Sequence, residues 1–279
     1  MNDQVAAAIL GIVEGLTEFL PVSSTAHIRL VQGLLSQDLE SDYWKMFAVV
    51  IQLGAILSVV VYFFRRLMNF VSSFFTSMRA GNRRHPLILV LISFIVTAGP
   101  CFLIEKLIDE TLENMFVISA ALIIGGIAMW WIDRRFSLQP ATTQVEDMTV
   151  KQAVVIGLVQ ILAAAFPGTS RSMATIAGGQ LMGLSRSAAL EYSFFLSIPV
   201  MAAATGYKLL KFMMNSPTGM TGDAWLTLAV GFAVSFVTAL IVIAWFMQWV
   251  RKHGFAPFAV YRVVLGLIVL AAAIYGWGR

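Results

Sequence analysis

The chain has 279 residues, of which 59% are hydrophobic and 12% are charged, and its mean hydropathy is +0.82. Soluble domains carry about 25% charged residues, so a soluble globule is excluded and a lipid bilayer is the expected solvent. The 19 Lys and Arg exceed the 15 Asp and Glu, but they lie between apolar stretches, which argues against a nucleic-acid partner and is typical of cytoplasmic membrane loops.

The first apolar stretch, residues 4–35, contains two carboxylates, Glu14 and Glu18, and a Pro-Val-Ser-Ser-Thr break at residues 21–25. No basic segment precedes it and no small-residue cleavage site follows it, so we expect it to stay in the mature protein. Each half is too short to cross a bilayer, which takes roughly 17 to 25 helical residues. We therefore predict a re-entrant hairpin of two half-helices.

Six other stretches are long and apolar enough to form transmembrane helices. They are expected near residues 44–64, 86–104, 115–132, 189–210, 224–249 and 257–277. Between the third and the fourth, residues 150–184 contain a second break, Pro-Gly-Thr-Ser-Arg-Ser at 167–172, which predicts a second re-entrant hairpin. The predicted fold is a single all-α polytopic membrane domain over residues 1–279.

The loop charges predict an orientation in the membrane. Lys and Arg follow the first, third and fifth spans, which should place these loops in the cytoplasm. The alternate loops are acidic, with Asp38, Glu40, Asp42, Glu105, Asp109, Glu110 and Glu113. Both termini are then outside, the first hairpin should enter from the outer face, and the second should enter from the cytoplasmic face.

The two broken segments resemble each other. With an offset of 146, residues 7–25 align with 153–171, and the shared residues include Pro21 with Pro167 and Ser24 with Ser170. Three spans lie between the copies, so the copies should be inverted, with repeat one at about 1–136 and repeat two at about 137–279. Inverted repeats with discontinuous helices place a polar site near the bilayer midplane.

Two acids precede the first break. Glu14 and Glu18 are four residues apart and so share one helix face. A buried acid costs about 2.5 kcal/mol or more in a membrane helix, so a shared proton, an Arg or a divalent cation must offset the pair. Mg²⁺ or Ca²⁺ prefers such hard oxygen ligands. The alternative is a neutral, hydrogen-bonded pair that only holds helices together.

Hydroxyl groups and a histidine follow the first break. If a helix restarts at Ser23 or Ser24, the serine caps it, and free N–H groups beside Thr25 form an anion site. His27 lies three residues after Ser24, the spacing at which an imidazole can act as acid or base for a hydroxyl. The alternative is a His that is simply hydrogen-bonded to a neighbour.

The second break supplies a cation. Arg171 lies between Ser170 and Ser172, and a guanidinium flanked by hydroxyls suits phosphate or carboxylate oxygens. The alternative is a structural pair with an acid of the first break. Two other charged residues are weaker candidates: Glu191, expected to pair with Arg186 or to lie at the interface, and Arg262, expected to snorkel to the membrane surface.

Glu14-Gly-Leu-Thr-Glu-Phe-Leu-Pro-Val-Ser-Ser-Thr-Ala-His27 and Pro167-Gly-Thr-Ser-Arg-Ser-Met-Ala-Thr175 resemble the two signature stretches of the bacterial undecaprenyl-diphosphate phosphatase family, the bacitracin-resistance type. The resemblance implies a membrane hydrolase that removes the terminal phosphate of the C55 isoprenoid diphosphate. The product is the carrier lipid for peptidoglycan synthesis, and the activity confers bacitracin resistance.

The resemblance also implies roles for individual residues. Glu14 and Glu18 would bind Mg²⁺ or Ca²⁺ with the diphosphate, and His27 would handle the proton. Ser24 would be the candidate nucleophile, with direct attack by an activated water as the alternative. The phosphate-binding residues would be Arg171, Ser170, Ser172, Thr175, Ser23 and Thr25. The expected partners are a polyprenyl diphosphate and membrane lipids, and a homodimer is left open. The competing interpretation is a transporter or lipid flippase, because inverted repeats with broken helices are also a transporter architecture.

Overall fold

A computed structural model describes residues 2–35, 37, 41–103, 114–136, 139–215 and 221–275. Most of the acidic loop residues that predict the orientation lie outside these ranges, namely Asp38, Glu40, Glu105, Asp109, Glu110 and Glu113. Within these ranges the secondary structure is helical, with one isolated bridge between Thr142 and Leu184. The predicted all-α class is confirmed.

Both broken segments form two helices separated by a short break. The first consists of α1 (Asp3–Thr17) and α2 (Ser24–Leu34), and the second of α8 (Val150–Ala165) and α9 (Arg171–Leu181). Pro167 ends α8 because the residue before a proline is disfavoured in the helical conformation. Pro21 lies four residues after Thr17, the last residue of α1, where a proline ring would clash with the Thr17 carbonyl and has no N–H to donate to it. That these helix pairs enter the membrane from one face stays a prediction.

Six long helices confirm the predicted spans, because each is long and apolar enough to cross a membrane. They are α3 (Asp42–Tyr62), α5 (Pro86–Leu103), α7 (Met115–Phe136), α10 (Arg186–Asn215), α11 (Gly222–His253) and α12 (Ala256–Ile274). The sequence patterns do not predict α4 (Phe64–Arg79), because its arginines make it too polar to resemble a transmembrane helix. A short 3-10 helix, η1 (Val145–Asp147), precedes α8.

The described helices belong to two compact units. Unit 1 comprises Met1–Phe19, Ser24–Tyr62 and Ser197–Trp245, and unit 2 comprises Leu20–Ser23, Phe63–Leu196 and Phe246–Arg279. The first break therefore belongs to unit 2, although α1 and α2 belong to unit 1. The repeat boundaries near residue 136 stay a prediction.

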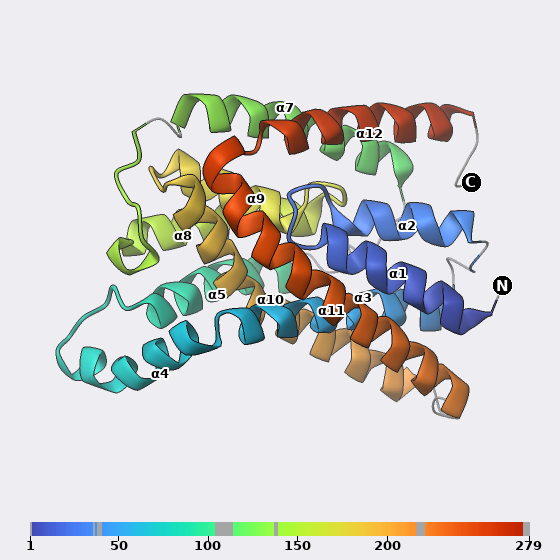
Figure 1. Ribbon diagram of the computed structural model, residues 1–279, viewed down its shortest axis with the longest axis horizontal. Coiled ribbons are helices and arrows are strands. Elements are labelled where there is room, and N and C mark those ends of the chain that lie inside the picture. Colours follow the sequence, from blue (N-terminus) through green and yellow to red (C-terminus); the bar gives the residue numbers. More distant parts are fainter. Residues whose placement is uncertain are drawn as a thin grey trace. The chain divides into compact units, whose positions relative to one another are not determined.

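In unit 1, α1 lies beside α2 (Figure 1) and crosses α11 at close range. A Cβ atom on Gly11 would lie 2.6 Å from the carbonyl oxygen of Gly231, and one on Gly15 would lie 2.6 Å from the Cβ of Thr238. Small residues at such a crossing let two membrane helices approach closely. This contact fixes the end of α1 that carries the two acids.

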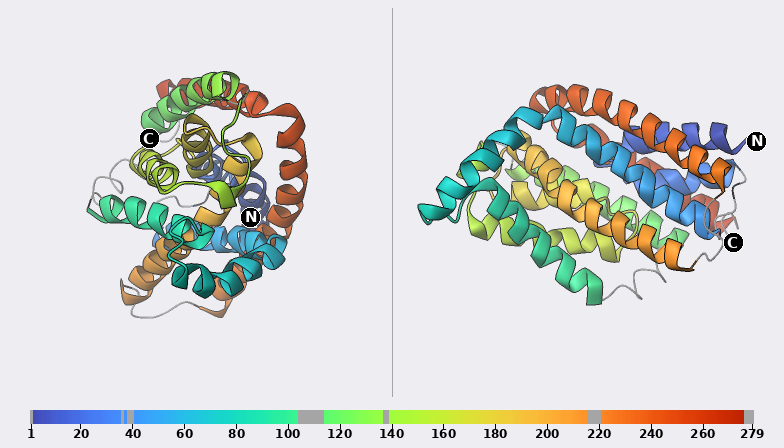
Figure 2. Two further views of the ribbon diagram at one scale, coloured as in Figure 1. Left: turned by 90° about the vertical axis from the view of Figure 1, so that its left-hand side faces the viewer. Right: turned by 90° about the horizontal axis from the view of Figure 1, so that it is seen from below.

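In unit 2, α12 packs along α7 (Figure 1). Helix α5 packs against α8 and also contacts α4 (Figure 2). Hydroxyls of α5 bond to carbonyls of α8: Ser93 Oγ donates to Ala153 O at 2.6 Å, and Thr97 Oγ1 to Gly157 O at 2.9 Å. Side-chain hydrogen bonds between helices stabilise membrane proteins. They hold α8, the helix that leads into the second break.

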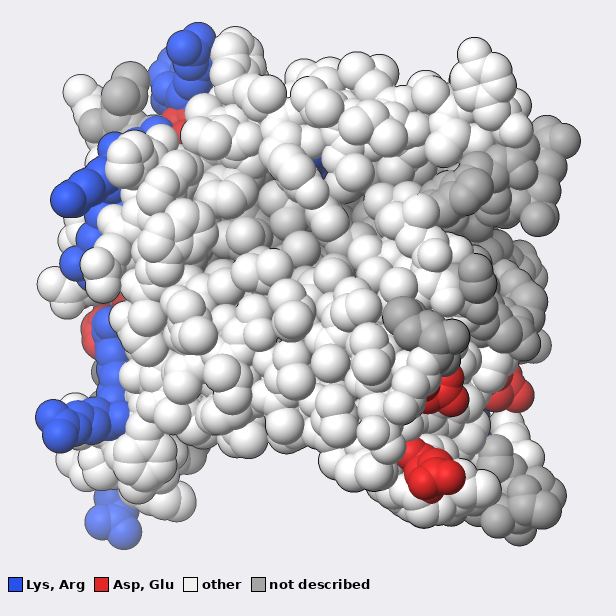
Figure 3. Space-filling model, turned by 45° about the vertical axis from the view of Figure 1, so that its right-hand side comes forward, with Lys and Arg blue, Asp and Glu red and all other residues white. Residues whose placement is uncertain are grey.

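The surface is typical of a membrane protein. In Figure 3, Lys and Arg gather along one edge of the visible face, and most of the remaining surface is uncharged. Large apolar side chains such as Ile95, Ile124 and Ile241 are exposed. Lipid tails are as apolar as these side chains, so the exposure carries no hydrophobic penalty in a bilayer.

Candidate functional site

The two acids of α1 are buried on one face of the helix. Glu14 is fully buried and Glu18 is 5% exposed. Glu18 follows the last helical residue but keeps helical backbone angles, and its N–H donates to Glu14 O at 2.9 Å. The helical course through Glu18 therefore places both carboxylates on the same side.

Ser24 bonds directly to one of these acids. Its Oγ donates to Glu18 Oε2 at 2.6 Å, and both side chains are buried in unit 1. A hydroxyl bonded to a carboxylate at this distance forms a strong, charge-assisted hydrogen bond. The sequence spacing predicts that the hydroxyl pairs with His27, which is half-buried one turn further along α2. In the structure, Glu18 is the group positioned to accept the Ser24 proton, and the role of His27 stays a prediction.

Both half-helices after the breaks begin at a strained serine. Ser23 has φ of 74° and Ser170 has φ of 71°, and these are the only non-glycine residues with positive φ in the described part of the chain. The left-handed region costs an L-residue roughly 1–2 kcal/mol. Strain of this kind clusters at functional sites, where the surrounding structure maintains it.

The strained serines also show how the two breaks correspond. Measured from them, the offset is 170 − 23 = 147 residues, one more than the offset of 146 from the sequence alignment. The second break has one additional residue between its proline and its serine. Pro21 therefore corresponds to Gly168, and Ser24 corresponds to Arg171.

The second break begins a capped helix. Ser170 Oγ accepts from Met173 N at 3.3 Å and so caps α9, and it lies 2.9 Å from Ser172 Oγ. The cap predicted at Ser23 or Ser24 of the first break stays a prediction. Ser172 Oγ also donates to Leu20 O of the first break at 3.0 Å. The free N–H groups and the positive dipole end of α9 make this terminus suited to an anion.

Arg171 is half-buried at this terminus, and a residue of α10 orients its side chain. Arg171 Nη1 donates to the backbone carbonyl of Ser193 in α10 at 3.0 Å. Thr175 is buried one turn further, with Oγ1 2.7 Å from Ser193 Oγ and 2.9 Å from Arg171 O. Thr175 and Arg171 therefore both bond to Ser193, and phosphate binding by Thr175 stays a prediction. Ser193 was missed, because a serine in an apolar run gives no sign of what it bonds to.

The two remaining predicted residues, Ser23 and Thr25, lie at the start of α2. Ser23 is 2% exposed, immediately before the helix, and Thr25 is half-buried in its first turn. The binding of phosphate by either hydroxyl stays a prediction.

The oxygen atoms of the first break suit a divalent cation. Glu14, Glu18 and Ser24 offer hard oxygen ligands of the kind that Mg²⁺ and Ca²⁺ prefer. Among the described residues, no three His, Cys, Asp or Glu side chains form a group that could hold a metal ion. Mg²⁺ is commonly bound by one or two carboxylates together with substrate phosphates and water, and the two acids fit that arrangement.

The structure corrects the prediction that Arg262 snorkels to the surface. Its side chain is fully buried and donates to three backbone carbonyls: Nη1 to Pro21 O at 3.2 Å, and Nη2 to Ala121 O and Gly168 O at 3.0 Å each. The breaks leave carbonyls without helical partners, and such groups must be satisfied inside a membrane protein. The guanidinium fills that need.

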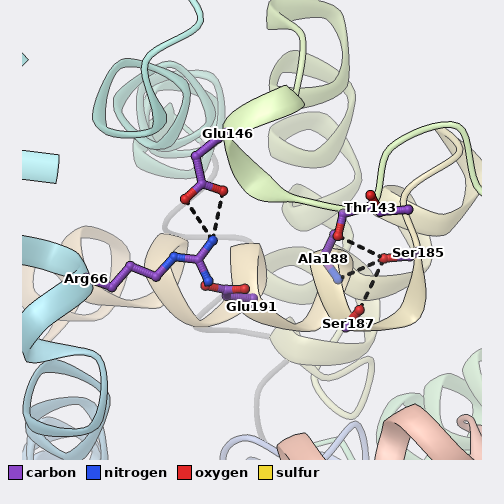
Figure 4. Close-up of polar contacts among 7 residues, drawn as sticks. All are labelled: Arg66, Thr143, Glu146, Ser185, Ser187, Ala188 and Glu191. Carbon is purple, nitrogen blue, oxygen red and sulfur yellow. Dashed lines mark hydrogen bonds and ion pairs between the residues drawn. The ribbon is translucent and has the colours of Figure 1, made fainter. Parts of the chain in front are cut away.

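The structure also corrects the partner of Glu191. Its carboxylate pairs with Arg66 of α4, whose Nη2 lies 2.8 Å from both carboxylate oxygens of Glu146 (Figure 4). Arg186 instead binds Asp133 with two hydrogen bonds, of 2.7 and 2.9 Å. Arg186 and Glu191 are close in the sequence, which suggested an ion pair between them. In the folded protein each of the two instead binds a residue of another helix.

The sequence places the chain in a known protein family. The chain is similar to the undecaprenyl-diphosphatase of Koribacter versatilis (strain Ellin345), with 53% identity over 98% of this chain and 99% of the relative. It is also similar to the undecaprenyl-diphosphatases of Rhodopseudomonas palustris (strain BisA53), at 43% over 99% of both chains, and Clostridium tetani (strain Massachusetts / E88), at 42% over 96% of both. The family model described as bacitracin resistance protein BacA matches residues 7–268. The chain therefore belongs to the bacitracin resistance protein BacA family.

Proposed function

We propose that the protein is an undecaprenyl-diphosphate phosphatase, which hydrolyses the C55 isoprenoid diphosphate to the monophosphate and inorganic phosphate. The observation that carries the proposal is the buried hydrogen bond of 2.6 Å between Ser24 and Glu18. A hydroxyl bonded to a carboxylate is an activated nucleophile. The relatives reported above are named for this activity.

In the proposed reaction, Ser24 Oγ attacks the terminal phosphorus while its proton passes to Glu18 Oε2. The bond from that phosphorus to the bridging oxygen breaks, and the lipid monophosphate leaves with the electron pair. His27 protonates the leaving oxygen, and water then releases phosphate from the serine. Direct attack by water, with Glu18 as the base, is the alternative course.

Positive groups stabilise the transferring phosphoryl group. Arg171 and the N–H groups at the start of α9 are suited to its oxygens, and Ser170 and Ser172 add hydroxyls. Fixed donors in a water-poor site stabilise developing charge far better than they would in water. Mg²⁺ or Ca²⁺ held by Glu14 and Glu18 would supply further charge neutralisation.

The first experiment measures phosphate release from C55 diphosphate by the purified protein in detergent. We expect release in Mg²⁺ or Ca²⁺, loss of release in chelator, and loss in both Glu18→Ala and Arg171→Ala. Glu146→Ala is the control, because this acid lies in the exposed pair with Arg66. No release by folded wild-type protein would contradict the proposal and favour a lipid flippase, which vesicles with labelled lipid would then test.

A second experiment separates the two courses of attack. Rapid-quench labelling with a substrate labelled in the terminal phosphate should trap a phosphoserine at Ser24. An active enzyme without a labelled intermediate would favour direct attack by water.

The proposed location is the bacterial inner membrane, with the site open to the periplasm. The lipid product would be recycled there for peptidoglycan synthesis, and the phosphatase activity would confer bacitracin resistance. A cysteine placed at Asp42, at the start of α3, should react with an impermeant thiol reagent added outside the cell. Reaction only after the membrane is opened would reverse the orientation.

Light scattering of the detergent-solubilised protein tests the homodimer that the sequence leaves open.

A further inference from the structure

Arg262 is bound in a way that the proposed reaction does not explain. Its side chain is 0% exposed, and it is the largest fully buried side chain in the described part of the chain. Each of its hydrogen bonds goes to a backbone carbonyl, and Nε has no partner among the described residues. A buried cation is ordinarily paired with a carboxylate, because desolvation of the charge is costly. The burial of Arg262 therefore carries a desolvation cost that no carboxylate offsets through the hydrogen bonds of its guanidinium.

The carbonyls that Arg262 binds are equivalent in the two breaks. Pro21 lies two residues before the strained Ser23, and Gly168 lies two residues before the strained Ser170. One guanidinium thus joins matching positions of two segments that are far apart in the sequence. Both breaks and Arg262 belong to unit 2.

The surroundings of the guanidinium are shaped for it. Gly125 and Gly126 lie on the face of α7 that meets α12. A Cβ atom on Gly125 would collide with Arg262 Nη2, and one on Gly126 would lie 3.2 Å from Arg262 Cβ. Gly168 itself has φ of 94°, and a Cβ there would lie 2.6 Å from Ile118 O. The glycines therefore leave the space through which the guanidinium reaches both breaks.

We propose that Arg262 is a positioning residue for the phosphatase site, and that its planar guanidinium holds the two breaks in register through the carbonyls of Pro21 and Gly168. Ser23 and Ser170 keep left-handed backbone angles only if the neighbouring chain is held, because each conformation is unfavourable alone. The inference rests on the proposed function, since the breaks carry the groups assigned to the substrate. Displacement of a catalytic group by about 1 Å can lower a rate about 100-fold.

The test uses two variants that disturb the guanidinium and one that does not. Arg262→Lys keeps the charge but loses the planar fork, and Gly125→Ala keeps Arg262 but displaces Nη2. Gly266→Ala is the matched control: it disturbs the same α7–α12 contact, where its Cβ would lie 2.7 Å from Ile123 Cγ1, away from the guanidinium. Hydrogen exchange and steady-state kinetics are measured on all three and on wild type, in detergent and below the melting temperature of each.

We expect Arg262→Lys and Gly125→Ala to accelerate exchange at both breaks together, at the amides of Val22 and Thr169. The acceleration should be about 10- to 100-fold, which corresponds to the loss of one hydrogen bond to a charged group. We also expect kcat to fall about 100-fold while KM changes little. Gly266→Ala should lower the melting temperature without changing exchange at the breaks or kcat.

Two results would overturn the inference. One is unchanged exchange at either break in Gly125→Ala, and the other is an equal loss of kcat in Gly266→Ala at the same stability. Gly125→Ala keeps the test decisive even if Arg262→Lys does not fold. Hydrogen exchange needs no turnover, so an inactive wild type would overturn the proposed function while the exchange data still decide the role of Arg262.

Discussion

Asp133 offers a stability prediction whose size follows from the structure. This residue of α7 is 1% exposed. Oδ1 accepts from Arg186 Nε at 2.7 Å and Gln180 Nε2 at 3.0 Å, and Oδ2 accepts from Arg186 Nη2 at 2.9 Å and Phe255 N at 3.1 Å. One carboxylate thus joins α7, the end of α9, the start of α10 and the connection into α12. Asp133→Ala should loosen all four.

The loss of the buried partners dominates the cost. Gln180 is 1% exposed and Phe255 is fully buried, and each buried donor left without a partner costs about 1–3 kcal/mol. The Arg186 side chain is 32% exposed, so water can rehydrate its charge and its share is small. We expect a total loss of about 3–5 kcal/mol, within the sum of about 2–6 kcal/mol for two buried donors left without a partner.

Thermal unfolding in detergent measures this loss. At about 2–4 °C per kcal/mol for a chain of this size, Asp133→Ala should lower the Tm by roughly 6–20 °C. Glu146→Ala is the control, because its pair with Arg66 is 34% and 40% exposed and such pairs contribute at most about 1 kcal/mol. Equal Tm shifts in the two variants would refute the reasoning that burial sets the value of these contacts.

Three further predictions follow from other contacts. Ser24→Ala should lower kcat at least about 1000-fold in phosphate-release assays, with normal folding; activity near wild type would exclude Ser24 as the nucleophile. Gly11→Ala should destabilise α1 against α11 by about 1–3 kcal/mol in thermal unfolding, whereas Gly99→Ala, where nothing lies within 4 Å, should not. Burial lowers the pKa of His85, whose Nδ1 accepts from Leu87 N at 3.3 Å. The contribution of the neutral His85 side chain to stability is therefore complete above the ordinary pKa of about 6.5 and is lost as the pH falls below that value. The Tm of wild type should therefore drop as the pH falls below about 6.5, whereas the Tm of His85→Asn should not. Parallel pH profiles of the two Tm values would contradict this.

Local features of the sequence were sufficient to predict the helices and the breaks. A helix that crosses a bilayer must satisfy its own backbone and be apolar over its length, so runs such as residues 44–64 reveal themselves without any partner. Pro21 and Pro167 interrupt helices for an equally local reason, because proline has no N–H to donate and its ring clashes with the carbonyl four residues earlier.

Only tertiary structure decided which charged groups meet. Arg262 resembled a snorkelling residue in sequence, yet it binds carbonyls more than 90 and 240 residues away in the chain. Ser24 was paired with His27 by spacing, yet its hydroxyl bonds to Glu18 across the first break. Glu191 and Arg186, five residues apart, each bind a residue of another segment. Apolar length and proline act within one segment, whereas a buried polar group takes whatever partner the packed helices bring to it, and that partner is set by the whole fold.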